Sequence, residues 1–258
     1  MNICWNHEAS RFTDSAGYLK LVSDEMGLDT FVSETGQEAD IVFNCESAHH
    51  FGIGRKLTFI YHIDPTWNHQ GNISERIDEC DAIFSTHMDV PYKDDPKFVF
   101  LPHAAHATWY EPVPKEFDVF LPPSPPGPYK KRRELSELIA SKFNTHTVGY
   151  GTPTRDYIRE MSKCKIIFNQ SGHNDVNRKI FDGMLHGILL TNDMEGLKEV
   201  GEADKHYFTY EGSPTEKIKW LLGGDLMNNY LYSTHLVLKE HTYHHRLLTI
   251  LSCISKLL

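Results

Sequence analysis

Two cationic residues, Arg178 and Lys179, stand at the start of a predicted helix. The dipole of a helix disfavours cations in its first turn, whereas a bound diphosphate would stabilise them there. The predicted strand before this helix, Ile166–Phe168, is followed by four small or polar residues, Asn169, Gln170, Ser171 and Gly172. In an open parallel sheet, ligands bind beyond the carboxyl ends of the strands. The pattern therefore predicts a site for a phosphorylated ligand, with Asn169, Ser171 and Gly172 placing donors near its diphosphate or sugar.

The segment Lys165–Asp193 as a whole is typical of a strand–helix–strand unit that binds a nucleotide. A second apolar run, Ile188–Leu190, is ended by the polar residues 191–193. Between the two runs, Ile180 and Met184 recur at helical spacing and predict the buried face of the helix. Other strands and helices must place this unit in a sheet.

Short apolar runs alternate with helical patterns along the chain, which predicts an α/β fold with parallel, doubly wound sheets. Strands are expected at 2–5, 41–44, 57–62, 82–85, 98–102, 118–121, 145–148, 166–168, 188–190 and 206–210. Helices are expected at 17–26, 73–80, 129–143, from 154, from about 178, and at 196–200 and 213–222. Glu111–Lys115 contains two prolines and is expected to separate a domain at 1–112 from one at 113–258. The largely helical tail, 228–258, is expected to pack back on the first domain.

Length and composition allow one large domain or two small ones, since the chain has 258 residues and 40% of them are apolar. No run approaches the roughly 18 apolar residues of a membrane span, and residues 1–10 lack a basic segment followed by an apolar one. A cytoplasmic protein without a membrane span is therefore expected. The five cysteines are widely spaced, which favours buried apolar side chains over a zinc site or a disulfide framework.

The charge of the chain is distributed unevenly. Residues 1–112 carry 7 Lys and Arg against 18 Asp and Glu, whereas residues 113–258 carry 19 against 17. An acidic first half disfavours broad nucleic-acid binding there, because neutralised phosphates supply most of the non-specific affinity. The second half is the better place for a polyanionic ligand.

Seven short motifs follow one another in the second half, at Ile166–Asn169, Lys179–Asp182, Gly187, Ile188–Thr191, Gly196–Glu199, Tyr207–Tyr210 and His241–Arg246. Their order and spacing resemble the sugar-nucleotide-binding domain of GT-B glycosyltransferases, in particular the group typified by the CgeB spore-maturation protein. A weaker likeness to this group covers 61–65, 80–85 and 101–106. The resemblance implies a GT-B-like fold with two Rossmann-like domains, a cleft between them and a C-terminal crossover helix.

The resemblance also implies a donor substrate, a nucleoside diphosphate sugar that is expected to be a UDP-sugar, and no required cofactor or metal. Asp182 stands where the family has its ribose-binding acid, and a carboxylate can accept two hydroxyl hydrogen bonds. Arg178 and Lys179 would stabilise the charge on the departing diphosphate. Lys179 and Asp182 replace an Arg and a Glu of the family, so their charge is kept while their reach changes. The proline-rich segment 122–128 replaces a loop that contains glycine in the family.

Two further groups of residues are candidates for donor binding. The turn Gly149, Tyr150 and Gly151 follows a predicted strand and could offer its backbone to a nucleobase, or it could be a plain turn. The residues Glu195, Gly196 and Glu199 follow the next strand and could contact the sugar, although Glu199 could equally be a surface acid.

A general base is expected from the first domain. His62 and Asp64 stand at the end of a predicted strand, and a His beside a carboxylate can transfer protons near neutral pH. The alternative is a strand-end His with a capping Asp. The 16 histidines include no HExxH pattern, so no metal site is expected. Arg246, in the segment HTYHHR, is expected to point outward from a helix.

The leading hypothesis is a metal-independent glycosyltransferase with a large acceptor: a polysaccharide, a protein or a hydroxymethylated DNA base. The DNA acceptor would need a basic strip, which only Lys130–Arg133 and Arg155 with Arg159 offer. One alternative is a protein of the same fold that binds or assembles with nucleotide sugars without turnover. Another is a sugar-nucleotide epimerase of GT-B-like fold.

Overall fold

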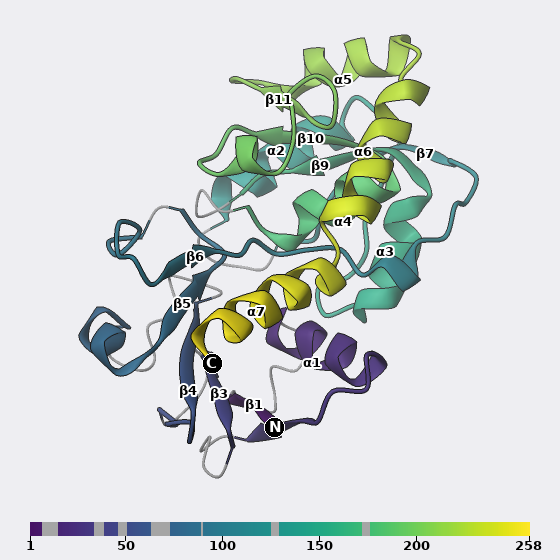
Figure 1. Cartoon of the computed structure of the whole chain (residues 1–258). Helices are drawn as coiled ribbons and strands as arrows, with labels where there is room; N and C mark the ends of the chain where they lie inside the picture. Colours follow the sequence, from purple (N-terminus) through teal and green to yellow (C-terminus); the bar gives the residue numbers. More distant parts are fainter. Residues whose placement is uncertain are drawn as a thin grey trace. The chain divides into compact units, whose positions relative to one another are not determined.

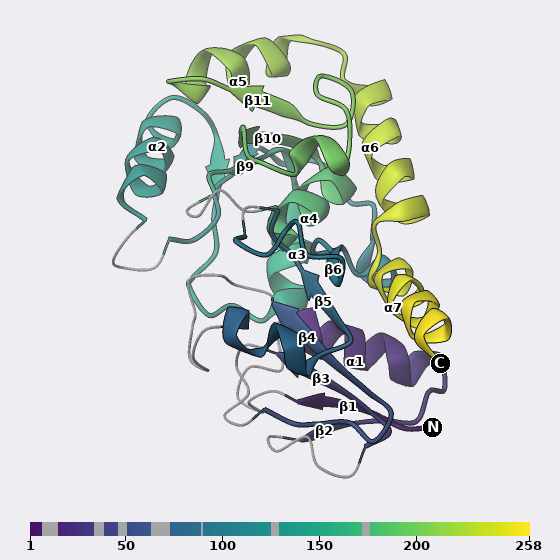
Figure 2. The same cartoon turned by 60° about the vertical axis from the view of Figure 1, so that its left-hand side comes forward.

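The chain divides into two compact units (Figures 1 and 2). The structure, a computed structural model, describes residues 1–6, 15–33, 39–45, 51–62, 73–88, 90–124, 129–171 and 176–258. Unit 1 comprises Met1–His103 and Tyr243–Leu258, and unit 2 comprises Ala104–Thr242. The division thus falls before the proline-containing segment Glu111–Lys115, and it passes through the helical tail.

Unit 1 is built on a parallel sheet in the order β2-β1-β3-β4-β5-β6. Its strands are β1 (Ile3–Asn6), β2 (Thr30–Ser33), β3 (Ile41–Cys45), β4 (Leu57–His62), β5 (Ala82–Ser85) and β6 (Phe98–Phe100). Its helices are α1 (Ser15–Glu25), the 3₁₀ helix η2 (Ile73–Glu79) and α7 (Tyr243–Leu257). The helix α7 packs against α1 within this unit. Five of these strands were predicted, whereas β2 was missed.

Aromatic side chains on neighbouring strands hold this sheet together. Trp5 stands opposite Phe43 and Phe43 opposite Phe59 in the register of β1, β3 and β4. The ring centroids lie 4.7 Å and 4.8 Å apart, respectively, and both pairs are stacked. Such cross-strand pairs each contribute up to about 1 kcal/mol. They explain why the apolar runs of the first half form adjacent strands.

Unit 2 is built on a second parallel sheet, in the order β11-β10-β9-β7-β8. Its strands are β7 (Phe117–Phe120), β8 (Thr145–His146), β9 (Cys164–Asn169), β10 (Ile188–Asn192) and β11 (Phe208–Tyr210). Its α-helices are α2 (Lys130–Ala140), α3 (Thr154–Ser162), α4 (Arg178–His186), α5 (Pro214–Gly223) and α6 (Met227–Glu240). Two 3₁₀ helices, η3 (Ala107–Trp109) and η4 (Leu197–Glu199), complete it.

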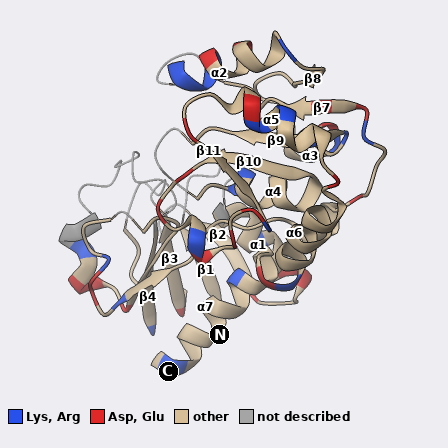
Figure 3. Cartoon of the chain, turned by 90° about the horizontal axis from the view of Figure 1, so that it is seen from above, with Lys and Arg blue, Asp and Glu red and all other residues tan. Residues whose placement is uncertain are grey.

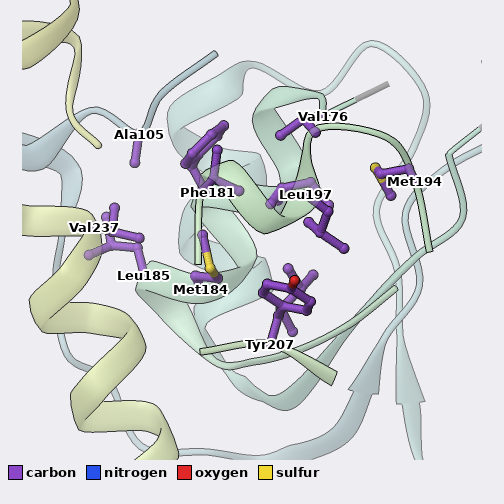
Figure 4. Packing of buried hydrophobic residues seen from close by; sticks show 12 residues of the cluster. Ala105, Val176, Phe181, Met184, Leu185, Met194, Leu197, Tyr207 and Val237 are labelled. Atoms are coloured by element: carbon purple, nitrogen blue, oxygen red, sulfur yellow. The ribbon is translucent and has the colours of Figure 1, made fainter. Parts of the chain in front are cut away.

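Helices cover both faces of the second sheet, as the doubly wound pattern predicts. Val119 and Ile166 point to one face, where they pack with Ile139 of α2 and with α5. Phe120 and Ile167 point to the other face, where they pack with α3. The helix α4 lies on this second face too and carries a core cluster that α6 closes (Figure 4).

The helix α4 lies very close to the sheet at Gly183. A Cβ atom at this position would stand 2.9 Å from Cδ1 of Leu189 and 3.4 Å from Cγ2 of Ile167. Phe181, Met184 and the rest of the core cluster fix the same helix from its sides (Figure 4). This tight packing gives the start of α4 a defined position above the sheet.

Arg246 is buried, so the prediction that it points outward is wrong. The side chain is 6% exposed. Its Nε donates to the carbonyl oxygen of Pro102 at 2.7 Å, and its Nη2 donates to that of His103 at 3.1 Å. Carbonyl groups at the end of a chain segment offer a buried guanidinium the hydrogen bonds that it needs. Arg246 therefore fixes the last residues of the first segment of unit 1 to α7.

A buried polar cluster joins the ends of α3 and α4. Lys115 Nζ donates to the carbonyl oxygens of Ser162 (2.8 Å) and His186, which close these two helices. Ser162 Oγ donates to Ile158 O at 2.7 Å and therefore accepts the hydrogen bond from His186 Nδ1, at 2.9 Å. Burial, aided by the charge of Lys115, lowers the pKa of His186 to about 3. The imidazole is therefore neutral in the folded protein.

His186 makes the folded protein sensitive to acid. Its folded pKa lies below the ordinary value of 6.5, so its contribution to stability is present above pH 6.5 and is lost as the pH falls towards 3. We expect the wild type to lose about 2 kcal/mol more than His186→Gln between pH 7 and pH 5, measured by urea unfolding. The exposed His235 on α6 provides the control, His235→Gln, which should follow the wild type. If His186→Gln and the wild type lose the same unfolding free energy between pH 7 and pH 5, the acid sensitivity does not come from His186.

Candidate functional site

The carboxyl ends of the strands of unit 2 share one edge of the sheet, because all five strands are parallel. Polar side chains tie this edge together. Asn169 Nδ2 donates to Thr191 Oγ1 at 3.0 Å, and the backbone N–H of Ser171 donates to Asn192 Oδ1 at 2.8 Å. Asn169 and Ser171 are both buried. They order the ends of β9 and β10, where ligands bind in folds of this kind.

The helix α4 begins at this edge with two cations. Asn177 caps it, since its Oδ1 accepts a hydrogen bond from the backbone N–H of Lys179 at 3.1 Å. The first turn contains Arg178 and Lys179 and no acidic residue. The helix dipole and two cations together make this end of the helix favourable for an anion.

Asp182 lies one turn further along α4 and holds Arg178. Arg178 Nε donates to Asp182 Oδ2 at 3.0 Å, and the side chains are 24% and 1% exposed, respectively. Burial raises the pKa of Asp182 to about 6, against the opposing effect of Arg178 and Lys179. The carboxylate is thus ionised at neutral pH and is enclosed by protein. Asp182, expected as an acceptor for ribose hydroxyls, thus accepts a hydrogen bond from the guanidinium of Arg178 and is almost fully buried.

The helix α2 begins at the same edge and has a cationic first turn as well, with Lys130, Lys131, Arg132 and Arg133 and no acidic residue (Figure 3). Arg132 is 5% exposed, and its Nε donates to the carbonyl oxygen of Gln170, directly after β9, at 2.9 Å. Only one signal in the sequence points to Arg132, the basic run at the start of a helix. Its burial depends on the contact with Gln170, which the run does not reveal.

Arg132 and Arg178 approach the same region from opposite faces of the sheet. Burial, and then the charge of Asp182, raise the pKa of Tyr157 on α3, and both Arg178 and Arg132 act on it in the opposite direction. Both arginines stand in the first turns of helices that begin at the carboxyl edge of the sheet, so this edge is positive and two helix dipoles point to it.

Gln170 extends the site towards β11. Its Oε1 accepts a hydrogen bond from the hydroxyl of Tyr210 at 2.6 Å, and its Nε2 donates to Ser171 O at 2.8 Å. Burial raises the pKa of Tyr210, so this hydroxyl keeps its proton. Arg132, Gln170 and Tyr210 thus form a continuous buried polar chain below the start of α2. Gln170 and Tyr210 were not predicted as site residues.

The predicted nucleobase turn follows β8 and leads into α3. Gly151 has a φ of 86°, a conformation that glycine adopts without strain. The turn is closed by Thr152, whose Oγ1 donates to Gly149 O at 2.8 Å. Tyr150 is 76% exposed at its tip. The turn therefore presents backbone and one aromatic ring to solvent at the carboxyl edge of the sheet.

The predicted sugar loop follows β10. Glu195, Gly196 and Glu199 line a shallow hollow of about 420 Å³. Gly196 has a φ of 82° and is the N-cap of η4, and Leu197 anchors this turn in the core. The loop is thus held in place by packing while its polar side faces outward.

The remaining predicted residues are described only in part. His62 is the last residue of β4 and lies in register with Ser85 of β5. Asp64 and Gly172 lie outside the described residues. In the described ranges, no group of three or more His, Cys, Asp or Glu side chains could hold a metal ion. None of the described helices is long and apolar enough to cross a membrane.

Three solved structures to which this chain is similar illustrate its fold. HepE of Anabaena, solved with UDP-glucose, is 10% identical, with a TM-score of 0.65 over 99% of this chain and 100% of HepE. The lipopolysaccharide outer core galactosyltransferase WaaB is 9% identical, with a TM-score of 0.62 over 100% of both chains. An α1,3-fucosyltransferase solved with GDP is 13% identical, with a TM-score of 0.58 over 100% of this chain and 89% of its own.

These similarities concern the fold. The expected fold class is confirmed: the chain has the GT-B fold, with two Rossmann-like units that each contain a parallel sheet. No known family profile matches the sequence, and no curated protein sequence is significantly similar to it.

Proposed function

We propose that this protein is a glycosyltransferase that binds a nucleoside diphosphate sugar at the carboxyl edge of the sheet in unit 2. The observation that supports this most strongly is that α2 and α4 both begin with a cationic turn at this edge, where Arg132 donates to the carbonyl oxygen of Gln170, directly after β9. Cations oppose the dipole at the start of a helix, and an anion bound between them and the helix end would offset this cost. A diphosphate supplies such an anion.

In this proposal, Arg178 and Lys179 stabilise the negative charge that develops on the departing diphosphate. Preorganised cations of this kind supply a large part of the rate of group transfer. The ion pair with Asp182 fixes the guanidinium of Arg178 before the donor arrives, so that little reorganisation is needed. Asp182 is therefore proposed as a positioning residue, and the transfer is proposed to be metal-independent.

The other predicted residues complete the donor site. The turn Gly149–Gly151 is proposed to pair its backbone with the nucleobase, and Asn169, Ser171 and Gly172 to approach the diphosphate. Glu195, Gly196 and Glu199 are proposed to contact the sugar. For the acceptor hydroxyl, His62 remains the proposed base, with Asp64 as its partner.

The finer aspects of the function are proposals too. We propose a UDP-sugar as the donor and membership in the CgeB-like group, on the motifs of the second half. None of the five cysteines, all of which the structure describes, forms a disulfide, and we propose a reducing compartment such as the cytoplasm.

The acceptor is proposed to be a polysaccharide or a protein in preference to DNA. Lys130–Arg133 lie on α2, whereas Arg155 and Arg159 lie on α3, and these helices cover opposite faces of the sheet. The two basic segments therefore do not form one strip along which a DNA backbone could run.

A thermal-shift screen tests the proposal. UDP, GDP, UDP-glucose and UDP-N-acetylglucosamine are each added at up to millimolar concentration to the full chain. A ligand at 100 times its Kd stabilises the fold by about 2.7 kcal/mol. Slow release of UDP from the stabilising UDP-sugar supports a transferase, tight binding without release supports a binding protein, and interconversion of the sugar supports an epimerase. No stabilisation by any nucleotide would overturn the donor site.

Arg132 offers a separate check on the same site. A lysine at this position keeps the charge but cannot donate to Gln170 O and to a phosphate through one planar group. We therefore expect Arg132→Lys to weaken UDP binding about tenfold, or about 1.4 kcal/mol, in isothermal titration calorimetry. The neighbouring Arg133→Lys serves as the control and should bind UDP as the wild type does. Equal affinities for all three proteins would remove Arg132 from the site.

A further inference from the structure

Unit 2 contains a second cavity that the donor site does not use. It has a volume of about 480 Å³ and lies between the segment 108–113 and the helix α3. This volume falls in the range of small-molecule sites, roughly 300–1,000 Å³. The side chains that define its chemistry are Trp109, Tyr110, Glu111, Arg155, Asp156 and Arg159.

The aromatic part of this cavity is held rigidly. The ring of Trp109 stacks on that of His106, with centroids 4.5 Å apart and an interplanar angle of 13°. Trp109 also packs against the core cluster that contains Tyr157. The hydroxyls of Tyr110 and Tyr230 lie 3.4 Å apart. A fixed aromatic surface binds a ligand without a large loss of side-chain entropy.

The charged part of the cavity is balanced. Arg155 and Arg159 stand one turn apart on α3, and Arg159 Nη2 lies 3.2 Å from Asp156 Oδ1. Glu111 faces the cavity from the other segment. Two guanidinium groups and two carboxylates leave no net charge. The cavity therefore disfavours a phosphate, because it has no excess of cations, and it disfavours an apolar chain, because four charged groups line it.

Balanced planar groups beside an aromatic ring fit a sugar. A guanidinium donates two parallel hydrogen bonds and a carboxylate accepts two, which matches pairs of neighbouring hydroxyls. The aromatic ring offers an apolar surface to the C–H face of a pyranose. Arg155 makes no ion pair with any described residue, so its donors are available to such a ligand.

We propose that this cavity binds a neutral saccharide unit, separately from the nucleotide, and holds a distal unit of a glycan acceptor on unit 2. That the cavity binds a sugar follows from the cavity alone. That this sugar belongs to the acceptor rests on the proposed function. The proposal favours a polysaccharide over a protein as the substrate.

An array of immobilised neutral, sulfated and phosphorylated oligosaccharides tests this proposal on the full chain. We expect retention on neutral glycans, and an at least tenfold loss of apparent affinity in the exposed-residue variants Arg155→Ala and Glu111→Gln, which leave the core untouched. Trp220→Ala on α5 removes an aromatic side chain that is 59% exposed and lies outside the cavity, so it should bind as the wild type does.

Three outcomes would overturn the proposal: no retention on neutral glycans, retention on sulfated or phosphorylated glycans only, or a loss in Trp220→Ala without a loss in Arg155→Ala. Calorimetry with UDP on the same proteins separates this inference from the donor site. Glycan binding without UDP binding would contradict the proposed donor site and support the saccharide site. UDP binding without glycan binding would support the donor site and contradict the saccharide site.

Discussion

Replacement of Arg178 and Lys179 together by alanine is expected to lower the rate of sugar transfer by about 10³-fold or more while the fold is kept. Removal of a single preorganised donor to a developing charge typically costs about 10²–10³-fold in kcat. The variant loses both cations of the first turn of α4. Arg132 and the cations of α2 stay in place, so donor binding should weaken less than turnover.

The fold of this double variant should survive because Asp182 can become neutral. Without Arg178, burial of the carboxyl group is no longer opposed by its ion-pair partner, and the pKa of Asp182 rises further above 6. The group then takes up a proton at neutral pH, so no unpaired charge is buried. Circular dichroism and the midpoint of thermal unfolding check this directly.

A matched control removes two cations elsewhere. Lys219 on α5 and Lys239 on α6 are exposed, and the variant Lys219→Ala with Lys239→Ala changes the net charge by the same amount. Initial rates with the UDP-sugar that stabilises the wild type are compared for the three proteins. Wild-type turnover in the Arg178→Ala, Lys179→Ala protein would rule out the phosphate role of α4.

The strands could be predicted from the sequence because their signal is local. Runs such as Ile166–Phe168 and Ile188–Leu190 are buried on both faces, and a continuous apolar run is typical of a parallel strand covered by helices. The strand β2, Thr30–Ser33, was missed for the same reason. It is a half-buried edge strand, and its sequence TFVS contains no such run.

The burial of charged side chains could not be predicted, because it depends on partners far along the chain. Arg132 is buried against Gln170, which is 38 residues away. Arg246 is buried against Pro102, which is 144 residues away. A guanidinium is normally exposed unless such partners satisfy it, so composition and spacing favour the exposed position. The sequence indicated where the cations stand and not which of them the fold encloses.

The difference between predicted exposure and observed burial has its clearest consequence at Asp182. Its place on α4 predicted an acid that faces the ligand, whereas the side chain is 1% exposed and paired with Arg178. A buried carboxylate with a raised pKa reduces the stability of the fold at neutral pH. If its purpose is to orient Arg178, its removal should stabilise the protein and impair the reaction.

Asp182→Asn is therefore expected to be more stable than the wild type at pH 7, by up to about 3 kcal/mol. The pKa of Asp182 in the folded protein, about 6, lies above its ordinary value of 3.8. The contribution of Asp182 to the free energy of unfolding is therefore most favourable below pH 3.8 and is lost as the pH rises through 6. An asparagine buries no charge, and the difference in unfolding free energy should nearly vanish at pH 4. The exposed acid of α2 gives the control, Glu137→Gln, which should change stability by less than about 0.5 kcal/mol at either pH.

The same variant should transfer sugar more slowly, because the amide no longer fixes the guanidinium of Arg178 by charge. In the wild type, kcat should fall as the pH drops below about 6, where Asp182 takes up a proton, and this acid limb should be absent from Asp182→Asn. Urea unfolding at pH 4 and pH 7 and a kcat profile over the same range measure both effects. If Asp182 positions Arg178, Asp182→Asn must be both more stable and slower than the wild type. An Asp182→Asn protein that is less stable than the wild type at pH 7, or that keeps the acid limb of the kcat profile, would show that Asp182 does not act through Arg178.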